Sequence, residues 1–145
     1  MSEPTEVRPF SNGSEADYWE WRNCERCTKR GEYDAEGVGP CAIETAVSMG
    51  RLLGTIPVEI AKRAGATISD QVDAMRGTGY CDMPKECAEL DLVMVCEFIT
   101  DRRKRAKPKC RAAATAVVTD DHGYRHAVCE RHRRIVEKPG VSVSE

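Results

Sequence analysis

The stretch Cys24-Glu25-Arg26-Cys27, which closely follows Trp19 and Trp21, decides how this chain folds. Two thiolates separated by two residues reach one tetrahedral metal ion from a single tight turn, and two more ligands arrive from elsewhere in the chain. The sequence contains 8 cysteines in 145 residues. A Cys-x-x-Cys pair with further cysteines downstream is typical of a zinc site, and less typical of a disulfide framework in a chain that looks intracellular. The sequence therefore predicts a fold held together by metal.

The composition favours the same interpretation. Hydrophobic residues make up 41% of the chain and aromatic residues only 6%, so a large core is difficult to assemble. Chains of this size with thin cores commonly add a metal, whose binding free energy then becomes part of the folding free energy. We expect an α+β protein made of a small helical zinc module and a three-stranded zinc-ribbon-like module.

The N-terminus has neither a basic region nor an apolar stretch, and the longest apolar run, residues 92–96, is too short to span a bilayer. We therefore expect a cytoplasmic protein with no membrane partner. Charge is uneven along the chain: residues 1–95 carry 10 Lys/Arg against 17 Asp/Glu, and residues 96–145 carry 12 against 7. This asymmetry indicates either a basic functional surface near the C-terminus or attraction between the two halves.

Local patterns divide the chain into four segments. We expect a disordered lead-in over residues 1–9, a helical four-cysteine module over 10–89, a zinc-ribbon-like module with a basic loop over 90–138, and a disordered tail over 139–145. Capping residues and apolar periodicity predict helices over 14–21, 41–53 and 55–63, and a short turn over 69–75. β-branched runs and an Asp-Asp-His-Gly turn predict strands over 90–99, 113–118 and 124–128, followed by a short helix from residue 129.

The first predicted metal site uses Cys24, Cys27 and Cys41, with either Cys87 or Cys81 as the fourth ligand. Pro40 favours a helix start at Cys41, where the helix dipole stabilises the thiolate that a metal requires. A structural zinc site needs four protein ligands, so one of the two remaining cysteines should complete it. Cys87 lies just ahead of the strand expected near residue 90 and is the favoured ligand, while Cys81 lies in a Gly-Tyr turn.

Several phrases in residues 9–90 resemble small uncharacterised zinc-binding proteins of tailed bacteriophages. The phrases are Pro9-Phe10-Ser11-Asn12-Gly13-Ser14-Glu15, Trp19 with Trp21, Asn23-Cys24 with Cys27, Cys41-Ala42-Ile43-Glu44, Ile56-Pro57-Val58-Glu59-Ile60-Ala61 and Glu86-Cys87-Ala88-Glu89. The resemblance implies a phage origin and metal-binding cysteines at Cys24, Cys27, Cys41 and Cys87. It does not extend to Cys81 or to the C-terminal third, and it implies no activity.

A second predicted site combines Cys96 and Cys110 with Cys129-Glu130-Arg131-His132. This segment is similar to small zinc ribbons, in which a cysteine pair, an Ala-Thr strand and a closing Cys-x-x-His surround one ion. Cys96 and Cys110 lie 13 residues apart instead of two to four, so Cys96 is the least secure ligand, and His122 and His126 are alternatives. With both sites filled, we expect two zinc ions.

The segment between Cys96 and Cys110 is strongly basic: Arg102, Arg103, Lys104, Arg105, Lys107 and Lys109. Clustered Lys and Arg neutralise nucleic-acid phosphates without reading sequence, although the run is also compatible with an ordinary solvated loop. We expect a non-enzymatic phage accessory protein that binds a host macromolecule, protein or nucleic acid. The alternative is a metal-dependent nuclease or other phosphoryl-transfer enzyme that uses Asp120, Asp121 and His122, although hairpin turns favour these residues for structural reasons. No small-molecule substrate or catalytic motif is identified.

Overall fold

The computed structural model describes residues 3–97, 109–136 and 142–144. The chain divides into two compact units, residues 1–91 (unit 1) and residues 92–145 (unit 2). Both helices and sheets are present, which confirms the predicted α+β class. No helix in the described part of the chain is long and apolar enough to cross a membrane.

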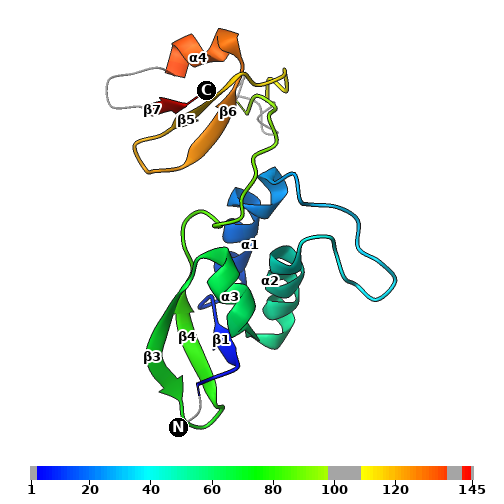
Figure 1. The fold of residues 1–145 in the computed structure, drawn as a ribbon, viewed down its shortest axis with the longest axis vertical. Helices are drawn as coiled ribbons and strands as arrows, with labels where there is room; N and C mark the ends of the chain where they lie inside the picture. The colour runs from blue at the N-terminus through cyan, green and yellow to red at the C-terminus, as the bar shows by residue number, and fades with distance from the viewer. Residues whose placement is uncertain (1–2, 98–108, 137–141, 145) are drawn as a thin grey trace. The chain divides into compact units, whose positions relative to one another are not determined.

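Unit 1 combines three α-helices with a four-stranded sheet (Figure 1). The helices are α1 (Gly13–Arg22), α2 (Ala42–Leu53) and α3 (Val58–Ala64), and a 3-10 turn η1 (Cys24–Arg26) follows α1. The strands are β1 (Glu6–Arg8), β2 (Ile56–Pro57), β3 (Thr67–Asp73) and β4 (Thr78–Asp82). Their order is β2-β1-β4-β3, with β1 parallel to β4 and the other pairs antiparallel.

Strand β1 corrects the predicted lead-in. Residues 1–9 read as disordered because Val7 is the only aliphatic side chain among them, yet Val7 is fully buried between β2 and β4. Val7 packs with Ile56, Val58, Ala61 and Cys81 in one core cluster, which places α3 against the sheet (Figure 1). Pairing between distant strands therefore orders a segment that has little local propensity of its own.

Two further local predictions for unit 1 were wrong. The turn predicted over residues 69–75 is instead strand β3, which hairpins onto β4 with an irregular register between Ile68 and Val72. Strand β4 itself was not predicted. The helix predicted from residue 55 begins at Val58, because Ile56 and Pro57 form the short strand β2.

Unit 2 contains a three-stranded antiparallel sheet of order β6-β5-β7. The strands are β5 (Ala116–Thr119), β6 (Arg125–Val128) and β7 (Ser142–Ser144), and helix α4 (Glu130–Val136) follows β6. Asp120 closes the β5–β6 hairpin by accepting the backbone N–H of His122 and of Tyr124, each at 2.9 Å. The hairpin and α4 confirm the sequence prediction, whereas β7 falls in the segment expected to be a disordered tail.

The apolar run predicted as a strand over residues 90–99 divides between the two units. Leu90 packs against the helical core of unit 1, and Leu92 and Cys96 are buried in unit 2. Within the described residues, the pairing recorded for Val95 is an isolated antiparallel bridge to Ala113. Residues 98 and 99 lie outside the described part of the chain.

Candidate metal centres

Four side chains of unit 2 form a compact group, which we call the ribbon cluster: Cys96, Cys110, Cys129 and His132. Their ligand atoms all lie within 4.8 Å of one another, and three of the four residues are buried. His132 Nδ1 is 3.4 Å from Cys96 Sγ and 3.4 Å from Cys129 Sγ, and the Sγ atoms of Cys110 and Cys129 are 4.0 Å apart. A tetrahedral zinc site with standard bond lengths has S···N edges of about 3.6 Å and S···S edges of about 3.8 Å. The ribbon cluster therefore has the dimensions of a four-coordinate zinc shell.

The unusual 13-residue spacing is accommodated by backbone pairing. Cys96 N–H donates to Ala112 O at 2.7 Å, Arg111 N–H donates to Cys96 O at 3.0 Å, and Ala114 N–H donates to Met94 O at 2.9 Å. These bonds align residues 94–96 with residues 111–114, so Cys96 and Cys110 lie side by side whatever separates them in sequence. Arg111, immediately after Cys110, adopts a left-handed backbone with φ of 57°, a rare conformation for a residue other than glycine.

The other two members of the ribbon cluster, Cys129 and His132, lie at the start of α4. Cys129 O accepts the N–H groups of His132 and Arg133 at 3.0 and 2.9 Å, and this turn brings the His132 ring back to the Cys129 thiol. The His132 N–H also lowers the pKa of Cys129 below its usual value, assisted by the thiols of Cys96 and Cys110 against the opposing effect of burial. This thiol is thus prepared to lose its proton to a metal.

The rival histidines lie outside the ribbon cluster. His126 Nε2 is 2.9 Å from Asp120 Oδ2, and its Nδ1 is 3.7 Å from Glu97 Oε2. His122 is exposed in the hairpin turn. The sequence left open whether Cys96 or one of these two histidines belongs to the second site. In the structure, Cys96 is the fourth member of the ribbon cluster.

The first predicted set also converges, but less tightly. Cys24, Cys27, Cys41 and Cys87 line one small pocket of about 20 Å³ in unit 1, which we call the four-cysteine pocket. Among the described residues, the ribbon cluster is the only group of three or more potential ligands with all ligand atoms within 4.8 Å. All eight cysteines are free thiols.

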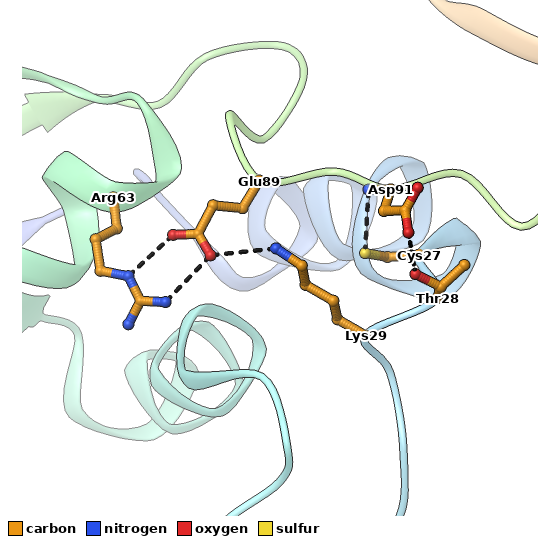
Figure 2. A network of polar contacts seen from close by, with 6 residues as sticks. All are labelled: Cys27, Thr28, Lys29, Arg63, Glu89 and Asp91. Atoms are coloured by element: carbon orange, nitrogen blue, oxygen red, sulfur yellow. Dashed lines mark hydrogen bonds and ion pairs between the residues drawn. The ribbon is translucent and has the colours of Figure 1, made fainter.

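Neighbouring chain segments position each of these cysteines. Cys24 begins η1, and Cys41 is the N-cap of α2, as the sequence predicted. Cys87 is fixed through its backbone, because its N–H donates to Asn23 Oδ1 at 2.8 Å. Figure 2 shows Asp91 beside Cys27: the Asp91 N–H lies 3.5 Å from Cys27 Sγ.

Cys81 does not line this pocket. It lies in β4, packs with Val7 and Ile56, and its thiol lies 3.7 Å from Arg8 O. Burial, with a smaller effect from the Asp82 carboxylate, raises the pKa of Cys81 to about 11. The structure thus favours Cys87 over Cys81 as the fourth member of the first set, and Cys81 is a core side chain.

Several residues of the pocket wall were not predicted from the sequence: Asn23, Lys29, Arg30, Glu44 and Glu89. In the sequence, Glu44 lies at a predicted helix start and Asn23 directly precedes a cysteine. No local pattern identifies either residue as part of a metal site. Of the basic run, Lys109 is exposed, while Arg102, Arg103, Lys104, Arg105 and Lys107 lie outside the described residues.

Comparison with known proteins gives one result. Neither the curated proteins nor the solved structures contain a match to the chain. Residues 1–77 match a family described as a domain of unknown function (DUF8270). This match ends before β4 and Cys87, so it includes three of the four cysteines of the pocket. Because it covers more than half of the 145 residues, the chain belongs to the DUF8270 family.

Proposed function

We propose that this protein is a non-enzymatic binding protein whose C-terminal unit is a zinc ribbon that presents a basic segment to nucleic acid. The observation that supports this most directly is the ribbon cluster, in which three thiols and one imidazole surround a single position at zinc-like distances. Four protein ligands fill a tetrahedral shell, which is typical of structural zinc; catalytic zinc keeps one position for water or substrate.

The small core of unit 2 supports a structural role for the metal. Its buried cluster consists of Cys96, Ala116, Val118, Val128 and Cys129. Two of these five side chains are ligands of the ribbon cluster and none is aromatic, so apolar burial alone contributes little. Zinc binding would supply much of the folding free energy of such a unit.

The position of the basic segment favours nucleic acid as the partner. Six Lys and Arg side chains lie between Cys96 and Cys110, and the backbone of Cys96 pairs with Arg111 and Ala112 directly after this segment. Of this segment the structure describes Lys109, which is exposed, and Arg111 and Arg131 are exposed elsewhere in unit 2. The resemblance to phage proteins makes a host nucleic acid in the host cytoplasm the expected target.

Among the described residues, the contacts of Asp120 favour a structural role over the catalytic alternative. Asp120 Oδ1 accepts two backbone N–H groups of the hairpin turn, and Asp120 Oδ2 pairs with His126. These contacts are the ones expected of an aspartate that stabilises a turn.

The experiment is a salt titration of duplex DNA and RNA binding by the zinc-loaded full chain. Affinity should fall steeply with salt, with a log–log slope for duplex DNA of about 0.9 per phosphate contacted. Changing Arg102, Arg103 and Lys104 together to alanine should reduce that slope by up to about 2.7 without releasing zinc.

A matched control changes the same number of charges in unit 1. Lys62, Lys85 and Arg76 are exposed there, and their triple alanine variant alters the net charge equally. It should leave the slope unchanged if the basic segment makes the contacts. An equal effect of both variants, or no binding at about 50 mM salt with zinc still bound, would refute nucleic acid as the partner and leave a host protein.

A further inference from the structure

We propose that unit 1 carries a metal site of its own, in which Cys24, Cys27, Cys41 and Cys87 bind one thiophilic divalent cation, with Zn²⁺ as the expected ion. This site goes beyond the proposed function, because it lies in the other unit of the chain and shares no ligand with the ribbon cluster.

The four cysteines converge from distant segments of the chain. Cys24 and Cys27 belong to the turn after α1, Cys41 begins α2, and Cys87 follows β4, yet all four line the same pocket. Its volume of about 20 Å³ is close to the minimum that holds one water molecule, which suits a single ion. A bound ion would draw the sulfurs to the spacing of about 3.8 Å found in tetrahedral thiolate sites.

One carboxylate oxygen in the pocket wall has no hydrogen-bond partner. Glu44 is only 5% exposed. Its Oε1 lies 3.4 Å from Arg30 Nε, but its Oε2 has no hydrogen-bond partner. A buried polar atom without a partner is unfavourable, and more so when it is charged, so native structures rarely keep one. The polar wall of the pocket is therefore incompletely paired.

Basic side chains lie near the four thiols. Lys29 and Arg30 line the pocket. Figure 2 shows Lys29 and Arg63 held by one carboxylate, Glu89, at 3.3 Å for Lys29 Nζ and 2.9 Å for Arg63 Nε. When Zn²⁺ replaces four thiol protons, the product is a Zn(S-Cys)₄ centre of charge −2 and four protons are released to solvent. Lys29, Arg30 and Arg63, taken with the Glu44 and Glu89 carboxylates that pair with them, leave one net positive charge, which offsets half of that −2.

Without a metal, two of the four thiols, Cys24 and Cys87, are poorly placed to ionise. Burial, with Glu44 and Glu20 beside it, raises the pKa of Cys24 far above the usual range of a thiol. Burial likewise raises the pKa of Cys87. Such thiols do not act as nucleophiles, but Zn²⁺ competes with their protons directly, as it does in structural sites generally.

The test is zinc protection of individual thiols in the full, wild-type chain. Reduced, chelator-treated protein and the same protein with Zn²⁺ are alkylated under native conditions, and each cysteine is quantified by peptide mass spectrometry. Cys27 and Cys41 are half-buried and should react in the metal-free protein. Zn²⁺ should slow the alkylation of both cysteines at least tenfold. Equal rates with and without Zn²⁺ would overturn the proposal.

A variant series separates this site from the ribbon cluster. Cys129→Ser removes a ribbon ligand, so this variant should retain one equivalent of Zn²⁺, and adding Cys87→Ser should reduce the content to zero. Cys81→Ser is the matched control, because Cys81 is an equally buried cysteine of the same unit that does not line the pocket; added to Cys129→Ser, it should leave one equivalent. No bound zinc in Cys129→Ser would refute the pocket site while leaving the proposed ribbon untouched.

Discussion

Asn23 offers the sharpest test of how unit 1 is held together, through the substitution Asn23→Ala. The side chain is 1% exposed and connects the end of α1 to the segment that carries Cys87. Its Nδ2 donates to Trp19 O at 3.0 Å and to Lys85 O at 3.2 Å, and its Oδ1 accepts the Cys87 N–H at 2.8 Å.

The expected cost follows from these three bonds. Each buried hydrogen bond contributes about 1 kcal/mol net, and the Cys87 N–H would be left without its partner, so Asn23→Ala should destabilise unit 1 by about 3 kcal/mol. With a urea m-value of about 1.5 kcal/mol/M, the unfolding midpoint should fall by about 2 M.

Tryptophan fluorescence is the appropriate assay. The only two tryptophans, Trp19 and Trp21, belong to α1, so the signal reports unit 1 and ignores unit 2. Asn12→Ala is the matched control, because Asn12 is the other asparagine of the chain and makes one exposed capping bond to Glu15 N at 2.9 Å. That loss should cost about 1 kcal/mol. If Asn23→Ala cost no more than Asn12→Ala, the buried asparagine would not be the connector we describe.

Two further predictions concern α2 and the hairpin of unit 2. Gly50→Ala would normally stabilise a helix by about 1 kcal/mol, but a Cβ at Gly50 would lie 2.8 Å from Ile56 Cγ2, so we expect a loss of about 1–3 kcal/mol in urea unfolding. Gly13→Ala, whose Cβ would meet no atom within 4 Å, should show no such loss. Burial opposes ionisation of Asp120, but hydrogen bonds from His126 and from the Tyr124 and His122 N–H groups outweigh it and lower the pKa of Asp120. Its ionised form therefore contributes stability that is present above the unfolded pKa of about 3.9 and is lost as pH falls through the lower folded value. Asp120→Asn should cost up to about 1 kcal/mol at pH 7 by circular dichroism, and a deficit that persisted undiminished at the lowest pH would contradict this reasoning.

Local spacing in the sequence was sufficient to find one pair of residues in each cysteine group. The Cys-x-x-Cys and Cys-x-x-His pairs each lie within one turn, and the helix that begins after Cys41 has a clear apolar periodicity. Cys110 and Cys96 could be named because few other ligands remained. Their pairing through residues 94–96 and 111–114 could not be predicted, since it depends on backbone bonds between segments that no local pattern connects.

The sheet of unit 1 was the largest omission. β1 offers one apolar residue, Val7, and β3 reads Thr-Ile-Ser-Asp-Gln-Val-Asp, where Ser69 and the aspartates resemble capping residues. These strands are specified by their partners: Gly79 in β4 allows Val7 to approach, with a Cβ there lying 3.2 Å from Val7 Cγ1. Such contacts between distant residues are invisible to propensity.

The backbone pairing of residues 94–96 with residues 111–114 has a consequence for how this chain can diversify. Once a ladder fixes both ends of a loop, lengthening the loop costs only about 0.6 kcal/mol for each doubling of its length. Residues 98–108 could thus be exchanged for peptides of other lengths while Cys96 N–H remains bonded to Ala112 O and Arg111 N–H to Cys96 O. The ribbon can therefore acquire new recognition sequences between these paired segments while the fold that carries them stays the same.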